Sequence, residues 1–112
     1  MNKYGNRKTM VDGIMFDSKH EAERYMELKY MERCKFIRDL QLQVPFELIP
    51  SQKDETGKVI ERPVKYIADF VYFDRVGNLV VEDAKSKATK TEAFKLKKKM
   101  MRAFKGIEIK EV

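Results

Sequence analysis

The stretch YIADFVYFDRVGNLVVEDAK, residues 66–85, decides the fold. Two runs rich in β-branched and aromatic residues flank a short segment that contains glycine, and this pattern predicts a β-hairpin. If Asp74 lies opposite Asn78, the same register places Asp69 opposite Asp83. These acids interrupt otherwise apolar strands, where an uncompensated buried charge is costly. The hairpin is therefore predicted to bring two aspartates together for a functional reason.

Alternation along the second strand of this hairpin puts Asp83 and Lys85 on one face and Glu82 on the other. Two directly opposed carboxylates have Cβ atoms ~5 Å apart and repel each other, so positive charge must lie between them. Lys85 supplies part of that charge, and a hard cation such as Mg²⁺ or Mn²⁺ would supply the rest. Glu82 stays an alternative second acid, because alternation is the only reason to prefer Asp83.

A helix is expected before the hairpin. Ser18 and Glu21 form a capping box, which predicts a helix from about 19 to 34. At 100° per residue, Glu21 falls on the core-facing side of this helix. Capping explains Glu21 locally, but beside a metal ion it would be an outer ligand. The apolar residues that share the core-facing arc are Ala22, Tyr25, Met26 and Leu28.

Between the helix and the hairpin, apolar and polar residues alternate over 40–48, as in a half-buried strand. Pro45 lies inside this run, which favours an edge position or a bulge. Residues 51–58 are polar and predict a loop between neighbouring strands.

A second helix is expected after the hairpin, capped by Thr89 or Thr91, running to about Lys105 and ending at Gly106. A short strand over 107–112 follows. One half of the helix wheel holds Ala93, Phe94, Leu96, Met100, Met101, Ala103 and Phe104. The other half holds Lys95, Lys98, Lys99, Arg102 and Lys105. Lys97 alone lies among the apolar residues, where it either reaches toward the acids or snorkels to solvent.

The predicted order α-β-β-β-α-β defines an α/β protein with a mixed central sheet flanked by helices. A chain of 112 residues has room for one hydrophobic core, so residues 18–112 are expected to form a single domain. Residues 1–17 show little periodicity and are expected to form an extended basic arm with Lys3, Arg7 and Lys8.

Composition excludes several classes of protein. No apolar run reaches the ~18 residues of a membrane helix, and the N-terminus does not resemble a signal peptide, so a cytoplasmic protein is expected. The single cysteine, Cys34, cannot form an internal disulfide. With one histidine, His20, a zinc site built from Cys and His is also excluded, and both are interpreted as ordinary helix residues.

The net charge of +6 is concentrated near the C-terminus, where residues 85–105 contain nine Lys or Arg and one acid. Such a block is a candidate surface for a polyanion, most often nucleic acid. A solvated helix face explains the charge equally well.

Asp69, then Asp83-Ala84-Lys85 after a hairpin, and a preceding helix with Glu21 together resemble the PD-(D/E)XK nuclease superfamily. The segments DSKHEAERY, YIADFVY and VVEDAKS are similar to those of short phage-encoded proteins assigned to it, close in layout to small Holliday junction resolvases. The chain departs from the family motif at Ala68, where proline is usual, and at Asp83, where glutamate is commoner.

The resemblance implies a restriction-endonuclease-like fold in which Asp69, Asp83 and the carbonyl of Ala84 bind Mg²⁺ or Mn²⁺. Glu21 would bind the metal directly or through water, and one or two ions are both compatible with this set. Lys85 would orient or deprotonate the attacking water. The implied activity is a metal-dependent endodeoxyribonuclease that hydrolyses phosphodiester bonds in Holliday junctions or other branched DNA.

The same resemblance implies a homodimer in the cytoplasm, or in the host cytoplasm if the chain is phage-encoded. The arm and the basic helix face (Lys95, Lys98, Lys99, Arg102 and Lys105) would contact phosphates without reading sequence. Two alternatives stay open at this point: a catalytically inactive nucleic-acid-binding module of the same fold, and a phage assembly protein whose basic helix meets an acidic partner.

Overall fold

The computed structural model describes residues 7–84 and 90–112. Its centre is a four-stranded sheet in the order β3-β6-β7-β8. These strands are β3 (Ile37–Ile49), β6 (Val64–Asp74), β7 (Leu79–Asp83) and β8 (Ile109–Glu111). The first three are antiparallel neighbours, whereas β8 is parallel to β7. A parallel neighbour requires a crossover connection, which includes α2 (Glu92–Met100).

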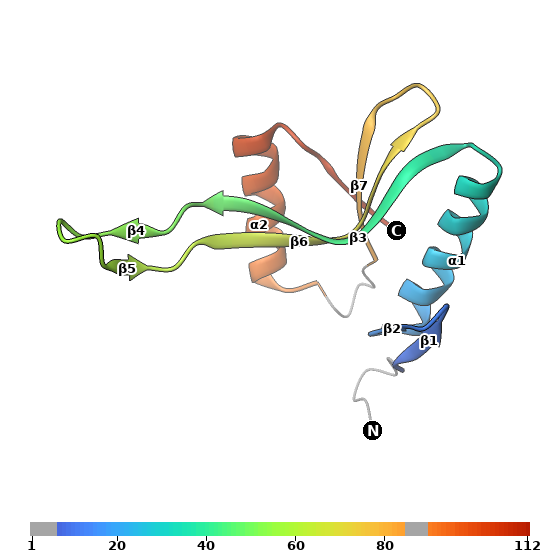
Figure 1. Cartoon of the computed structure of the whole chain (residues 1–112), viewed down its shortest axis with the longest axis horizontal. Coiled ribbons are helices and arrows are strands. Elements are labelled where there is room, and N and C mark those ends of the chain that lie inside the picture. The colour runs from blue at the N-terminus through green and yellow to red at the C-terminus, as the bar shows by residue number, and fades with distance from the viewer. Residues whose placement is uncertain (1–6, 85–89) are drawn as a thin grey trace.

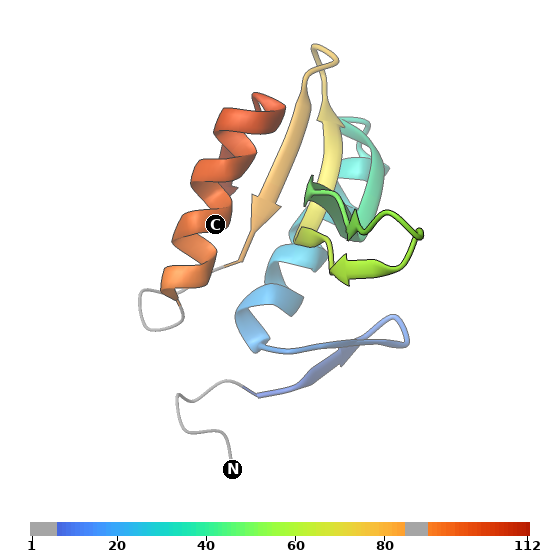
Figure 2. The same cartoon turned by 90° about the vertical axis from the view of Figure 1, so that its left-hand side faces the viewer.

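The helices α1 (Lys19–Arg33) and α2 lie on opposite faces of the sheet, as Figures 1 and 2 show. Val80 packs in the cluster beneath α1, and the next residue, Val81, packs in the cluster beneath α2. Consecutive strand residues point to opposite faces, so the two clusters are the two sides of one sheet. A mixed sheet flanked by helices, in the predicted order of six elements, is confirmed.

The hairpin register is confirmed. The β6–β7 ladder pairs Phe73 with Leu79 and continues to Phe70 opposite Glu82. The turn closes with the Asp74 amide donating to the Asn78 carbonyl at 2.9 Å. One step beyond the last paired residues, the same register puts Asp69 and Asp83 at corresponding positions.

The N-terminal segment differs from the expected extended arm. Residues 9–16 form a hairpin of β1 (Thr9–Val11) and β2 (Ile14–Phe16) that lies against α1. Its turn, Asp12-Gly13, has positive φ at both residues, which is the geometry that Asp-Gly favours in two-residue hairpins. The Tyr25 hydroxyl donates to Asp12 at 3.0 Å, and the Tyr25 ring packs on Phe16 at 4.9 Å between centroids. This Asp-Gly pair was the signal that periodicity alone missed.

Helix α1 begins where the capping box predicted, with the Ser18 hydroxyl accepting from the Glu21 amide at 3.1 Å. Ala22, Tyr25 and Leu28 are buried as expected. Met26 is 48% exposed, so its place in the core was wrong. At 100° per residue it lies 100° from Tyr25, at the edge of the buried arc.

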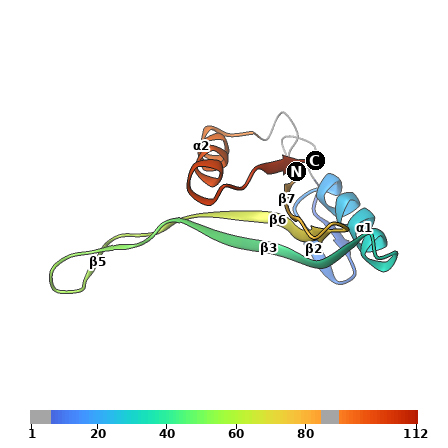
Figure 3. The same ribbon diagram turned by 90° about the horizontal axis from the view of Figure 1, so that it is seen from above.

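Strand β3 is an edge strand, as Pro45 predicted, and its register shifts between Arg38 and Gln41 and again between Glu47 and Ile49. The polar segment 51–58 is part of a projection rather than a simple loop. Two short strands, β4 (Gln52–Lys53) and β5 (Val59–Glu61), extend the β3–β6 pair outward. Figure 3 shows this β4–β5 projection leading away from the helices.

Helix α2 is capped by Thr91, whose hydroxyl accepts from the Phe94 amide at 3.0 Å; Thr89 lies outside the described residues. A π-helical turn (η2, Met101–Lys105) ends at Gly106, which has a φ of +66°. The predicted apolar half was too wide. Leu96 and Phe104 are 58% and 60% exposed, and Ala93 and Ala103 are exposed too. The side that faces the sheet is a narrower stripe, in which Phe94, Met100 and Met101 pack against the core. Lys97 and Lys98 on the same side are half-buried.

In the part of the chain that the structure describes, neither helix is long and apolar enough to span a bilayer.

Candidate active site at the fork of the sheet

The predicted acids lie where the sheet divides. Strand β6 pairs with β7 only as far as Phe70, but it continues beside β3 to Val64. Asp69 is the first residue of β6 beyond the β7 ladder, and Asp83 is the last residue of β7. We call this point, defined by Asp69 and Asp83, the sheet fork. The diverging strands are visible in Figure 1.

Asp69 is held from two sides. Its Oδ2 accepts from the backbone amide of Ala84 at 2.9 Å, just past the end of β7. Its Oδ1 accepts from the Nε2 of Gln43, on β3, at 3.2 Å. Hydrogen bonds to a carboxylate are stronger than those between neutral groups, so these two contacts fix the Asp69 side chain. They connect β6 to β3 and to the residue that follows β7.

Gln43 also links Asp69 to helix α1. The same Nε2 donates to Oε1 of Glu21 at 3.3 Å, and Glu21 is only 8% exposed. The prediction that Glu21 faces the core is confirmed, and the structure brings its carboxylate to the sheet fork through the amide. Nothing in the sequence marks Gln43, because a glutamine at an outward position of a half-buried strand is ordinary.

The backbone of Gln43 is unusual, with a φ of +52° in the middle of a strand. A residue other than glycine in the left-handed region costs about 1–3 kcal/mol and persists only where its surroundings enforce it. Such residues concentrate at functional sites, so the position of Gln43 between two acids is informative.

Asp83 is 3% exposed, and its Oδ2 accepts from the Tyr66 hydroxyl at 2.5 Å. Burial and then this hydrogen bond raise the pKa of Tyr66 above its ordinary value. The negative charges of Asp83, Asp69 and Glu111 raise that pKa further. Three acids therefore act on a single hydroxyl, which supports a shared neighbourhood for Asp69 and Asp83. Tyr66 was also missed, because its ring is an ordinary core residue by sequence.

Glu82, the alternative second acid, has a different environment. It is 0% exposed and accepts from Nε and Nη2 of Arg24 at 2.8 and 2.7 Å. The Tyr72 hydroxyl also donates to it. This bidentate pair ties α1 to β7 on the α1 side of the sheet, and it occupies both carboxylate oxygens. The geometry therefore favours Asp83 over Glu82 as the site acid.

The metal-ligand set of Glu21, Asp69, Asp83 and Ala84 stays a prediction. Within residues 7–84 and 90–112, no three Asp, Glu, His or Cys side chains are grouped closely enough to hold a metal ion. The Ala84 amide donates to Asp69, and metal binding by the Ala84 carbonyl stays a prediction. Lys85 lies outside the described residues. The chemistry of the donors fits, since carboxylate oxygens are what Mg²⁺ and Mn²⁺ prefer.

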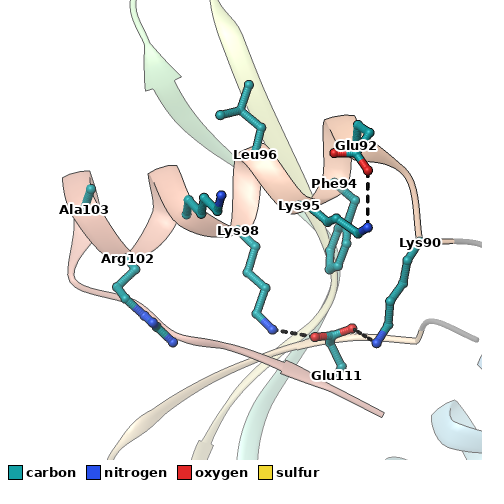
Figure 4. Close-up of a pocket in the computed structure, with 10 residues that line it drawn as sticks. Lys90, Glu92, Phe94, Lys95, Leu96, Lys98, Arg102, Ala103 and Glu111 are labelled. Atoms are coloured by element: carbon teal, nitrogen blue, oxygen red, sulfur yellow. Dashed lines mark hydrogen bonds and ion pairs between the residues drawn. The ribbon is translucent and has the colours of Figure 1, made fainter. Parts of the chain in front are cut away.

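A groove of about 850 Å³ runs along α2, and Figure 4 shows its lining. We call it the basic groove. Its charged lining residues are Lys90, Lys95, Lys98, Lys99 and Arg102, together with Glu92 and Glu111. Glu111 lies opposite Asp83 in the parallel β7–β8 ladder. Through Glu111, one wall of the basic groove therefore adjoins the end of β7.

Several bases of the predicted nucleic-acid face pair with acids. Lys95 contacts Glu92 at 3.2 Å, and Arg102 contacts Glu108 at 2.6 Å. Lys98 and Lys90 lie 2.5 and 2.9 Å from Glu111. Of the five bases of the predicted face, Lys99 and Lys105 have no acid at ion-pair distance within the described ranges, and both are exposed.

Two further predictions concern Lys97 and the basic residues of the N-terminal segment. Lys97 is half-buried on the sheet-facing stripe of α2, and no ion pair joins it to an acid among the described residues. This environment favours snorkelling over a role at the sheet fork. In the N-terminal segment, Arg7 and Lys8 are exposed, whereas Lys3 lies outside the described residues.

Fold and site together define a small mixed α/β protein with a four-stranded sheet. At the sheet fork, Gln43 joins the carboxylates of Glu21 and Asp69, and the buried Asp83 ends the neighbouring strand β7. The chain belongs to the family described as "Protein of unknown function (DUF1064)", whose model matches residues 1–111. No significant match was found among curated proteins or solved structures.

Proposed function

We propose that the protein is a Mg²⁺- or Mn²⁺-dependent endodeoxyribonuclease with a restriction-endonuclease-like fold of the PD-(D/E)XK type. The observation that carries the proposal is the link from Glu21 through Gln43 to Asp69, beside the buried Asp83. Acids from a helix and two strands, followed in the chain by Lys85, form the arrangement that the resemblance to this superfamily implies.

Within this proposal, Asp69 and Asp83 would hold the cation, and Glu21 would complete or extend its oxygen shell. A bound cation would supply the positive charge that polarises a phosphoryl oxygen and makes water more acidic. The hydrogen bond from the Ala84 amide fixes one oxygen of Asp69, and the other oxygen accepts from Gln43, which also donates to Glu21. Lys85 follows directly and would orient or deprotonate the attacking water.

The basic groove would bind the phosphates next to the scissile bond. Lysine and arginine contacts to phosphates position DNA without reading its sequence, which suits an enzyme selective for DNA structure. Because Glu111 is the ladder partner of Asp83, a phosphate chain that follows α2 would pass close to the end of β7. Branched DNA such as a Holliday junction is the proposed substrate, cut by a homodimer that makes paired incisions.

The test is a cleavage panel of branched, duplex and single-stranded DNA, each with Mg²⁺, Mn²⁺ or EDTA. Wild-type protein should cut at least one DNA shape only with a divalent ion, and Asp69→Asn should remove the cutting while DNA binding is retained. Asp39→Asn is a matched control, because Asp39 is an exposed acid on β3 and asparagine tolerates its left-handed backbone. Cutting by Asp69→Asn at the wild-type rate would disprove the assigned site.

A non-catalytic nucleic-acid-binding module of the same fold is the second candidate. It is favoured by the finding that no three potential metal ligands are grouped within the described residues. Salt-dependent DNA binding with no cleavage in any arm of the panel would support this candidate. Light scattering of the purified protein, with and without DNA, tests the proposed homodimer in either case.

A further inference from the structure

The backbone at Gln43 cannot be explained by strand pairing. The ladder pairs Leu42 with Phe70 and Val44 with Ala68, so the register runs through Gln43 without a shift. Asp39, the other left-handed residue in β3, does lie at a register shift. A bulge accounts for Asp39, whereas Gln43 needs another reason.

The strand pair rotates from one side of the sheet to the other at this level. Leu42 packs in the cluster beneath α1, and Val44 packs in the cluster beneath α2. Their partners Phe70 and Ala68 divide in the same way. A left-handed residue serves such a rotation, but glycine or asparagine would serve it with less strain. The presence of glutamine therefore points to its side chain.

That side chain has a defined orientation. The ionised carboxylates of Glu21 and Asp69 can only accept hydrogen bonds, so the nitrogen end of the Gln43 amide must face them. An amide nitrogen has two hydrogens, one for each acid, at 3.3 and 3.2 Å. The two acids belong to different elements, α1 and β6, whose relative placement no single element controls.

We propose that Gln43 is a positioning residue that holds the carboxylates of Glu21 and Asp69 at the separation and orientation in which they share one divalent cation. The inference rests on the proposed function for the identity of that cation. Residues that hydrogen-bond to metal ligands, without binding the metal themselves, orient those ligands and raise affinity. Gln43 does this from a third element, the edge strand β3.

The experiment compares Gln43→Gly with Asp39→Gly. Both changes relieve a left-handed backbone in the same strand, but only the first removes an amide from the acid pair. Mn²⁺ alone is titrated into each protein by calorimetry, and DNA affinity and cleavage are then measured. Gln43→Gly should lower Mn²⁺ affinity by about 10–100-fold, the range observed for partners of metal ligands. Asp39→Gly should match wild type.

A positioning role has a second signature. Gln43→Gly should lower kcat with DNA affinity unchanged, and raising the Mn²⁺ concentration should restore part of the rate, which a misfolded protein would not show. If Gln43→Gly does not fold, Gln43→Asn tests the same claim, because asparagine accepts the backbone but is one methylene shorter. It should also weaken Mn²⁺ binding.

Two failures are distinguishable. Mn²⁺ affinity of Gln43→Gly and Gln43→Asn within twofold of wild type would overturn the positioning role and leave the nuclease proposal intact. Wild-type protein that binds no Mn²⁺ and cuts no DNA would overturn the nuclease proposal, and the shared cation with it.

Discussion

Glu82 and Asp83 are neighbours in the chain with opposite surroundings. Both are buried, and each accepts a hydrogen bond from a tyrosine hydroxyl. Glu82 points to the α1 side, where Arg24 binds it through two nitrogens. Asp83 points to the α2 side, where Asp69 and Glu111 act on the same tyrosine. A buried acid bound by arginine is a structural tie, whereas a buried acid among other acids is a candidate for chemistry.

The two acids are also coupled mechanically. Arg24 lies three residues after Glu21 on α1, and Glu82 immediately precedes Asp83 on β7. The Arg24–Glu82 pair therefore fixes the helix that carries one site acid against the strand that carries another. The ion pair of Glu82 therefore helps to fix the relative positions of Glu21 and Asp83.

Breaking the structural tie should have the largest effect on stability. Arg24→Ala leaves Glu82 buried without its guanidinium, and loss of one partner of a buried pair typically costs about 3–5 kcal/mol. Urea unfolding should show this loss. Lys19→Ala is the control, because it breaks an exposed pair with Glu23 on the same helix and should change little. Equal stability of the two variants would contradict the structural role of Glu82.

Asp83→Asn sharpens the comparison. The amide oxygen still accepts from Tyr66, and loss of a charge near Asp69 and Glu111 relieves repulsion, so stability should be unchanged or higher. Cleavage should fall by about 100-fold or more, as when a group that stabilises developing charge is removed. Glu82→Gln should give the reverse, a less stable protein. Thermal unfolding measures the stability and the folded fraction of both variants. Cleavage rates, divided by the folded fraction, then decide between the two roles.

The sequence predicted the hairpin register because its geometry is local. The turn fixes Asp74 opposite Asn78, and every later pair follows. The choice of Asp83 over Glu82 also followed from alternation, which holds along β7. Glu21 could be placed on the core side because one helix turn determines its direction.

Other features depend on contacts between distant segments. Gln43 meets Glu21 and Asp69 only because β3 rotates at that level, and alternation contains no information on such a rotation. The wide apolar half predicted for α2 was wrong because burial depends on what the sheet offers opposite the helix. Leu96 and Phe104 are exposed, and neither packs in the cluster of buried residues beneath α2.

The basic helix face permits a comparison between bases that pair with acids and bases that do not. Lys98 and Arg102 already contact acids, whereas Lys99 and Lys105 have no acid partner within the described ranges. DNA must displace an acid before it can contact Lys98 or Arg102. The double change Lys99→Ala and Lys105→Ala should therefore flatten the salt dependence of DNA binding by about two in slope, and more than Lys98→Ala with Arg102→Ala. Binding titrations across a range of KCl concentrations measure both slopes.

The smallest effect concerns Glu111, the acid that joins the groove to the sheet fork. The hydrogen bond from Lys98, and then that from Lys90, lowers the pKa of Glu111 below its ordinary value of 4.5. Its stabilising contribution is therefore present above pH 4.5 and is lost as the pH falls through the lower, folded-state pKa. Wild type should exceed Glu111→Gln in unfolding free energy by about 1 kcal/mol or less at pH 7, since solvent screens the pair. That difference should close in urea titrations as the pH falls below the folded-state pKa of Glu111, with Glu108→Gln as an exposed control. A difference that persists once the carboxylate is protonated would mean that Glu111 supports β8 by packing and not through its ion pairs with Lys98 and Lys90.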